Sequence, residues 1–208
     1  MTTTTHASEV EKASAERLKF FSDAVIAIAM TLLALELPVP SGETVGEVWR
    51  SFGGNWEEYL AFLITFWVIG QQWMNHHSFL RYVDRVPHAF VRLNVLWLLT
   101  VVVTPFAMRI LVSEAPFEFG FTLYGIVQVL SALIRFLMIR QIRGHDLAGP
   151  EAPAGFYRDI QVRLLGLALI FAVAVPFAYL IGHWAYAIWV AGPAVIGGLR
   201  RRVGRQRR

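Results

Sequence analysis

The sequence predicts an all-α integral membrane protein with six transmembrane helices in each subunit. Hydrophobic residues make up 56% of the chain and charged residues only 16%, whereas soluble domains carry about 25% charged residues. The mean hydropathy is +0.50. The long apolar runs show no alternation with a period of two, and lipid admits only helices or closed barrels. These observations favour helical spans.

Six apolar runs approach the roughly 20 residues that cross a hydrocarbon core of about 30 Å. The first five are clear, whereas the sixth is short and contains Gly192-Pro193 and Gly197-Gly198. We predict helices near residues 20–38, 57–76, 89–111, 117–139, 160–181 and 183–199. The six-helix domain then covers residues 20–199, between a cytosolic N-terminal segment (1–19) and a basic cytosolic tail (200–208).

The basic residues indicate the orientation of these spans. All 19 Lys and Arg residues except Arg50 and Arg109 fall in the N-terminal segment, in the second and fourth loops with their flanks, or in the tail. The positive-inside rule places these segments in the cytosol, which requires an even number of spans and cytosolic N- and C-termini. The tail is expected to touch anionic lipid and not nucleic acid.

The sequence contains no motif for enzymatic chemistry. It has no cysteine, which excludes disulfides and thiolate metal sites. It also has no Gly-rich phosphate loop, no G-x-S-x-G and no H-E-x-x-H pattern. We therefore expect neither an enzyme nor a cofactor, and no bound metal. The T-V-G-Y-G filter of common potassium channels is absent as well.

Helical periodicity divides the first span into two faces. With about 100° per residue, five side chains fall within about 60° of Ile28 and form one stripe. This first-helix stripe consists of Ala24, Ile28, Thr31, Leu32 and Leu35. Ser22 and Asp23 lie about 120° and 140° from Ile28, so the acid points away from the stripe. Periodicity alone is equally typical of lipid contact or of a packed core.

Ser22 and Asp23 are polar groups at the cytosolic edge of an apolar helix, where an unpartnered charge is costly. They either cap the helix or bind a neighbouring span. The second span returns to the same depth and ends near Trp73, His76 and His77, so a Ser22–His or Asp23–His contact is expected. A structural hydrogen bond and a pH-sensitive element remain open for the histidines, and a metal half-site is disfavoured.

The pattern R-x-x-x-F-S-D, formed by Arg17, Phe21, Ser22 and Asp23, resembles the transmembrane protein 175 family of potassium channels. The W-x-x-H pattern of Trp73 and His76 is also similar to the family. Weaker similarity covers Leu93-Asn94 and Pro105-Phe106 in the third span. The fourth to sixth spans add only length and hydropathy.

This resemblance implies a potassium-permeable channel in a bacterial plasma membrane, assembled as a homotetramer with the first helices around a central pore. Carried onto this sequence, the family's apolar constriction corresponds to Ile28, Leu32 and Leu35, with Thr31 as the neighbouring hydroxyl. The expected partners are potassium ions, the lipid bilayer and further copies of the chain. The motif residues, with Trp73 and His76 or His77, are expected to form a structural network.

Two other functions are compatible with the sequence. A proton-coupled secondary transporter usually carries polar groups near the middle of the membrane, where this chain offers mainly Gln128. A non-conducting membrane scaffold would use the motif only for packing. Glu36, near the outer end of the first span, either attracts cations in an outer ring or faces the lipid headgroups.

Overall fold

The structure, a computed structural model, describes residues 2–192 and is built from helices, which confirms the all-α prediction. An isolated bridge between Val83 and Ala148 is its one extended pairing within these residues. The elements are α1 (Thr2–Leu32), the 3-10 turn η1 (Leu33–Glu36), α2 (Val45–Gly54), α3 (Trp56–Leu80), α4 (His88–Leu111), α5 (Phe117–Gly144), α6 (Phe156–Ile181) and the 3-10 turn η2 (Gly182–Ala185).

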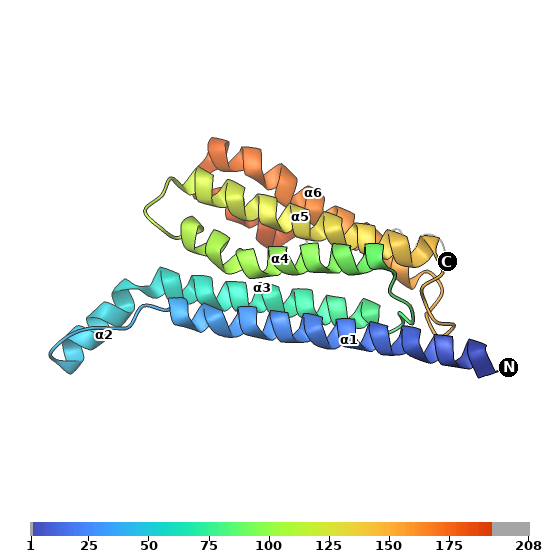
Figure 1. Ribbon diagram of the computed structural model, residues 1–208. Helices are drawn as coiled ribbons and strands as arrows, with labels where there is room; N and C mark the ends of the chain where they lie inside the picture. The colour runs from blue at the N-terminus through green and yellow to red at the C-terminus, as the bar shows by residue number, and fades with distance from the viewer. Residues whose placement is uncertain (1, 193–208) are drawn as a thin grey trace.

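The long helices lie roughly along one direction and form an elongated bundle (Figure 1). α1 packs against α3 and α4, and α5 packs against both α4 and α6. The N-terminus and the α3–α4 and α5–α6 loops lie at one end, which we call the basic end. α2 projects from the opposite end, beside the junction of α1 and α3 (Figure 1).

Four stretches are long and apolar enough to cross a membrane: Glu11–Glu36, His88–Leu111, Phe117–Gly144 and Phe156–Gly192. α3 has 25 residues, which is enough to span, but its second half carries Gln72, Asn75 and two histidines. α3 is therefore not among the four stretches. It stays the predicted second span, and it packs against both α1 and α4.

The predicted sixth span begins with a reversal of the chain at Gly182. This glycine has a φ of 58°, in the left-handed region that side chains disfavour. The chain then runs back beside α6, since a Cβ added to Gly192 would lie 2.8 Å from the side chain of Ile170. The rest of the predicted span and the tail 200–208 lie outside the described residues.

Two features differ from the sequence prediction. α1 begins at Thr2, so residues 2–19 continue the first span as one helix, and Ser22 and Asp23 lie inside the helix and cannot cap it. α2 was not predicted. It begins with a capping box between Thr44 and Glu47, a local signal that hydropathy windows miss.

The half of the bundle next to the basic end, which we call the basic half, holds the larger apolar core. Phe79, Phe90, Trp97 and Met138 are each at most 1% exposed and bring α3, α4 and α5 together. Between membrane helices such side chains stabilise the bundle through van der Waals packing. The opposite half has a smaller aromatic core around Phe121, between α5 and α6. The basic half therefore provides the rigid surface against which α1 is held.

Candidate pore face and polar network of the first helix

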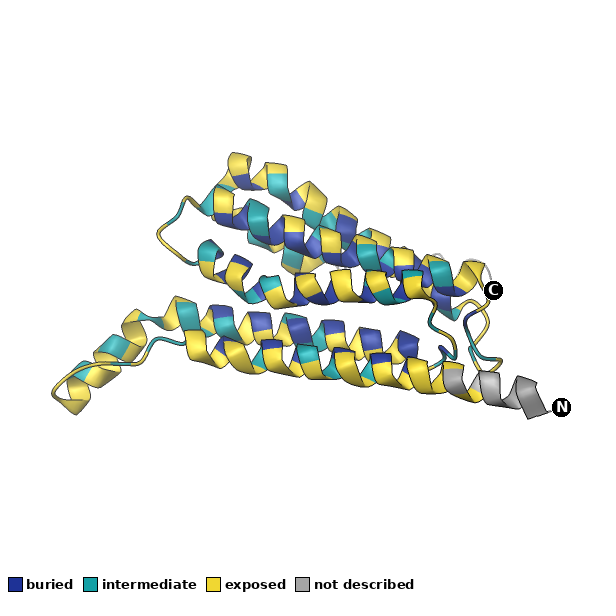
Figure 2. Cartoon of the chain, viewed as in Figure 1, coloured by how far each residue is buried: buried dark blue, intermediate teal, exposed yellow. Residues whose placement is uncertain are grey.

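The first-helix stripe lies on the surface of the subunit. Ile28 is 58% exposed, Leu32 51% and Leu35 80%, although all three are large apolar side chains. Ala24 and Thr31 are exposed on the same side. Figure 2 shows exposed residues along α1 and buried residues along α4 and α5. An exposed apolar face of this length in a membrane helix meets either lipid or another protein surface.

The opposite face of α1 carries a buried serine. The Ser22 side chain is fully buried, and its hydroxyl donates to the carbonyl oxygen of Leu18 at 2.8 Å. The same oxygen accepts a hydrogen bond of 2.8 Å from the Nδ2 amide of Asn94 in α4. Since apolar neighbours such as Ile26 and Ala29 are buried on this side too, Ser22 fixes which face of α1 meets α4.

Asn94 connects Ser22 to α3. Its Oδ1 lies 2.8 Å from Nε2 of His76, and because a carboxamide oxygen only accepts, His76 donates through Nε2–H. Asn94 is fully buried and His76 is 1% exposed. One carboxamide therefore links α1, α3 and α4. The expected direct Ser22–His contact is wrong in this detail, because Asn94 stands between the two residues.

Asp23 has a different partner from the one predicted. Its Oδ1 accepts a hydrogen bond of 2.8 Å from the indole Nε1 of Trp73 in α3, so the expected Asp23–His contact is also wrong. His77 is exposed, and its ring packs beside that of Trp73 at 5.8 Å. Of the two histidines, His76 therefore joins the buried contacts and His77 stays at the surface.

The contacts continue from His76 into α5. The His76 ring stacks on Trp97 with ring centroids 4.2 Å apart, and the Trp97 indole donates to the hydroxyl of Ser131 at 3.2 Å. Ser131 in turn donates to Gln72 at 3.1 Å. We call the whole set the polar network: Ser22, Asn94, His76, Trp97, Ser131, Gln72, Gln128 and Arg135.

Arg135 is a charged member of the polar network, although it is only 3% exposed in a membrane span. Its Nε donates to the carbonyl oxygen of Ser131 at 3.3 Å, and its guanidinium lies 5.9 Å from the centroid of the Trp97 ring. Carbonyl and aromatic contacts of this kind stabilise a buried cation. The charge lies next to the His76–Trp97 stack and helps to hold α5 against α4.

Arg17 and Phe21 do not take part in the polar network. Both side chains are exposed, and Phe21 has 53% of its surface free. Counted along the helix, they lie about 20° from Ile28, on the side of the first-helix stripe. The R-x-x-x-F-S-D motif therefore divides between two faces of α1.

Sequence reasoning singled out His76 and, as a mid-membrane polar group, Gln128, but not Gln72, Ser131 or Arg135. Gln128, Ser131 and Arg135 follow one another at spacings of three and four in α5, and Gln72 and His76 are four apart in α3. Such spacings put polar groups on one helix face, which is a recognisable signal inside apolar spans. The sequence does not show, however, which of these faces meet.

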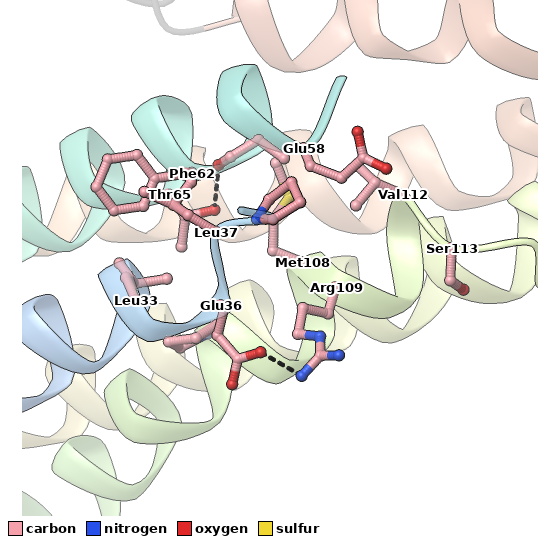
Figure 3. A pocket seen from close by; sticks show the side chains of 13 residues that line it. Leu33, Glu36, Leu37, Glu58, Phe62, Thr65, Met108, Arg109, Val112 and Ser113 are labelled. Atoms are coloured by element: carbon pink, nitrogen blue, oxygen red, sulfur yellow. Dashed lines mark hydrogen bonds and ion pairs between the residues drawn. The ribbon is translucent and has the colours of Figure 1, made fainter. Parts of the chain in front are cut away.

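Glu36 occupies the rim of a cavity at the end opposite the basic end. The cavity has a volume of about 240 Å³ and lies between η1, α3 and α4 (Figure 3). The Glu36 carboxylate forms an ion pair with Arg109, one of the two basic residues on that side. Both side chains are well exposed, so the pair adds less than about 1 kcal/mol to stability. Glu36 is thus tied to α4 within its own subunit.

Replacing Trp73 by Phe tests the contact of Asp23. The change keeps a ring but removes the indole donor. We expect the free energy of unfolding to fall by about 1 kcal/mol, since a hydrogen bond to a carboxylate is strong but this one is partly exposed to solvent. The thermal unfolding midpoint of the purified protein in detergent measures this loss. Trp67→Phe is the matched control, since Trp67 lies on the same helix and is 66% exposed. Equal effects of the two changes would contradict the assignment.

Comparisons with known proteins cover both the first helices and the whole bundle. The family described as endosomal/lysosomal potassium channel TMEM175 matches residues 17–105, which hold the second half of α1, all of α2 and α3, and most of α4. A potassium channel of Streptomyces collinus is 33% identical over 168 residues, covering 78% of this chain and 82% of the relative. A potassium channel of Chamaesiphon minutus is 44% identical over 104 residues, about half of each chain.

A solved structure extends the similarity to the fold. The crystal structure of a lysosomal potassium-selective channel TMEM175 homolog from Chamaesiphon minutus superposes with a TM-score of 0.72 and 26% identity. The alignment covers 90% of this chain and 98% of that one. The sequence similarity covers most of the Streptomyces collinus relative, and the helix bundle is shared with the solved structure. The chain therefore belongs to the TMEM175 family.

Proposed function

We propose that the chain is a potassium-permeable channel of a bacterial plasma membrane, and that four copies surround a pore lined by α1. The observation that carries this proposal is the first-helix stripe, whose large apolar side chains are exposed in the single subunit. The relatives named above are potassium channels, which supports the same ion for this chain. The distribution of basic residues supports cytosolic termini.

The stripe requires several copies of the chain to enclose a pore. One subunit supplies one copy of the first-helix stripe, and the opposite face of α1 carries the buried Ser22, Ile26 and Ala29. Closed rotational symmetry turns each stripe residue into a ring, so Ile28, Leu32 and Leu35 would form successive apolar rings. Apolar rings restrict ions because a partly dehydrated ion finds no ligand there.

Thr31 is the one hydroxyl of the first-helix stripe. Its Oγ1 donates to the carbonyl oxygen of Ile28 at 2.9 Å, which directs the hydroxyl hydrogen back to the helix. The lone pairs of the oxygen then remain available to a cation. We infer that Thr31 provides a polar ring between the apolar ones.

Potassium flux from sealed liposomes tests the proposed function. Liposomes that contain the purified protein and a potassium gradient should release potassium when a proton carrier compensates the charge, whereas empty liposomes should not. Native mass spectrometry of the detergent-purified protein should show a tetramer. Absence of flux would overturn the channel, and saturable flux driven by a proton gradient would indicate a carrier. A monomer as the largest species would overturn the shared pore.

A further inference from the structure

A groove at the basic end lies between the end of α5, the α5–α6 loop and the start of α6. Its volume is about 630 Å³, and its lining includes two guanidinium groups, those of Arg143 and Arg158. Phe156, Tyr157 and Pro153 add apolar surface. We propose that this arginine groove binds the phosphate-bearing headgroup of an anionic phospholipid.

Arg143 is held in place at the groove by a buried partner. Its Nη1 donates to Oε1 of Gln161 in α6, and Gln161 is only 7% exposed. The Gln161 Nε2 donates in turn to the carbonyl oxygen of Phe136 at 3.5 Å. Arg143 itself is exposed, so its remaining N–H donors face outward. The guanidinium is therefore oriented before any ligand arrives, which lowers the entropic cost of binding.

The charge of the groove is complementary to a phosphate. Arg158 stands in the first turn of α6, and neither it nor Arg143 forms an ion pair with a carboxylate within the part of the chain that the structure describes. Asp146 contributes one carboxylate to the lining, so the side chains that line the groove carry a net charge of +1, and the carboxylate of Asp159 follows Arg158 in the same turn of α6. Arg85 adds a third guanidinium nearby, where it donates to the Asp146 carbonyl oxygen at 3.0 Å. Guanidinium groups bind phosphate through two parallel hydrogen bonds.

The start of α6 supports an anion at the same place. Gly155, which precedes the helix with a φ of 78°, has no side chain, and no side chain caps this end. The first N–H groups of a helix lack partners within the helix, and the helix dipole places positive charge there. The Phe156 N–H already donates to the carbonyl oxygen of Pro153 at 3.1 Å, so the donors at this end are the N–H groups of Tyr157 and Arg158, two residues that line the same groove.

The depth of the groove in the membrane favours a lipid over a soluble anion. α5 and α6 are long apolar spans that end and begin at the groove, so the groove lies where lipid headgroups are found. Tyr157 is fixed by a hydrogen bond of 3.1 Å from its hydroxyl to the carbonyl oxygen of Phe79. The half-buried Phe156 lines the groove beside Tyr157 and stacks edge-on against it, with ring centroids 5.2 Å apart. The assignment of the groove to the cytosolic leaflet rests on the proposed function, which gives the orientation of the chain. Its location at headgroup depth does not depend on that orientation.

Thermal unfolding in mixed micelles tests the lipid site. We expect dioleoyl phosphatidylglycerol to raise the unfolding midpoint of the full-length protein, relative to dioleoyl phosphatidylcholine, because a ligand of the folded state stabilises it. The double variant Arg143→Gln/Arg158→Gln should bind phosphatidylglycerol about tenfold or more weakly and lose most of the shift. The control Arg81→Gln/Arg92→Gln removes two exposed charges from the same end and should keep the shift.

Three results would overturn the site. The shift could survive in the Arg143/Arg158 variant, or disappear equally in the Arg81/Arg92 control, which would indicate general surface charge. Inorganic phosphate could reproduce the shift in wild type, which would indicate a soluble anion. If the Gln variant does not fold, Arg143→Lys/Arg158→Lys replaces it, and unchanged affinity there would also contradict bidentate binding. A missing potassium flux in wild type would defeat the channel proposal while leaving this midpoint shift unaffected.

Discussion

Replacing Leu32 by Asn is expected to raise potassium flux at least about tenfold. Leu32 is 51% exposed on the first-helix stripe, where four copies would form an apolar ring. Asn places amide oxygens in this ring and lets water and potassium enter it. A tenfold increase corresponds to a barrier lowered by about 1.4 kcal/mol. The initial rate of potassium release from liposomes, at equal amounts of reconstituted protein, measures the effect.

The matched control is Leu169→Asn in α6. Leu169 is 63% exposed, and α6 lies on the opposite side of the bundle from α1 (Figure 1). Leu169→Asn is the same chemical change as Leu32→Asn at a similarly exposed position. We expect residue 169 to face lipid, so potassium flux should stay at the wild-type level. Flux of a large organic cation should remain at background in both variants, which excludes a general leak. An unchanged flux in Leu32→Asn, or equal increases in both variants, would contradict a pore on the stripe.

The division of α1 into two faces could be predicted from sequence because it depends on helical geometry alone. A rotation of about 100° per residue places Ile28, Leu32 and Leu35 together and turns Ser22 away from them. The structure exposes the first three and buries Ser22. Their role in a pore stays a prediction, because a single subunit does not show what covers the stripe. The all-helical bundle was predictable for a similar reason, since the length of each apolar run indicates whether a helix can cross the membrane.

The partners inside the bundle could not be predicted in the same way. The sequence places Ser22, Trp73 and His76 near the same depth, but it does not give the rotation of α3 and α4 about their own axes. The structure inserts Asn94 between Ser22 and His76, and pairs Asp23 with Trp73. α2 escaped prediction because its 10 residues are too few for a hydropathy window.

Replacing Asn94 by Leu is expected to destabilise the subunit by about 2–4 kcal/mol. Leu has the same branched arrangement of heavy atoms but is bulkier, so the change removes hydrogen bonds without opening a cavity and adds some cost of overpacking. The His76 Nε2–H would lose its acceptor while fully buried, and an unsatisfied buried polar group costs about 1–3 kcal/mol. Ser22 would lose one donor but keep its bond to Leu18, so its contribution is smaller. Unfolding of the purified protein in detergent measures the loss.

Asn75→Leu provides the comparison, because Asn75 is exposed on α3 directly beside His76 in sequence. We expect it to change stability by less than about 0.5 kcal/mol, as is usual for surface substitutions. A stability loss as large as that of Asn94→Leu would show that the effect comes from adding leucine at this depth and not from the polar network.

A double variant separates loss of the hydrogen bond from loss of packing. His76→Leu combined with Asn94→Leu removes both partners, and no buried donor is then left without an acceptor. Replacing both members of a buried pair costs less than removing either alone, so the combined loss should be smaller than the sum of the single losses by more than about 0.5 kcal/mol. Additive losses would mean that Asn94 and His76 act independently. A non-additive result would show that the Asn94 carboxamide couples α4 to α3 through His76, beside the bond by which the same carboxamide holds Ser22 of α1.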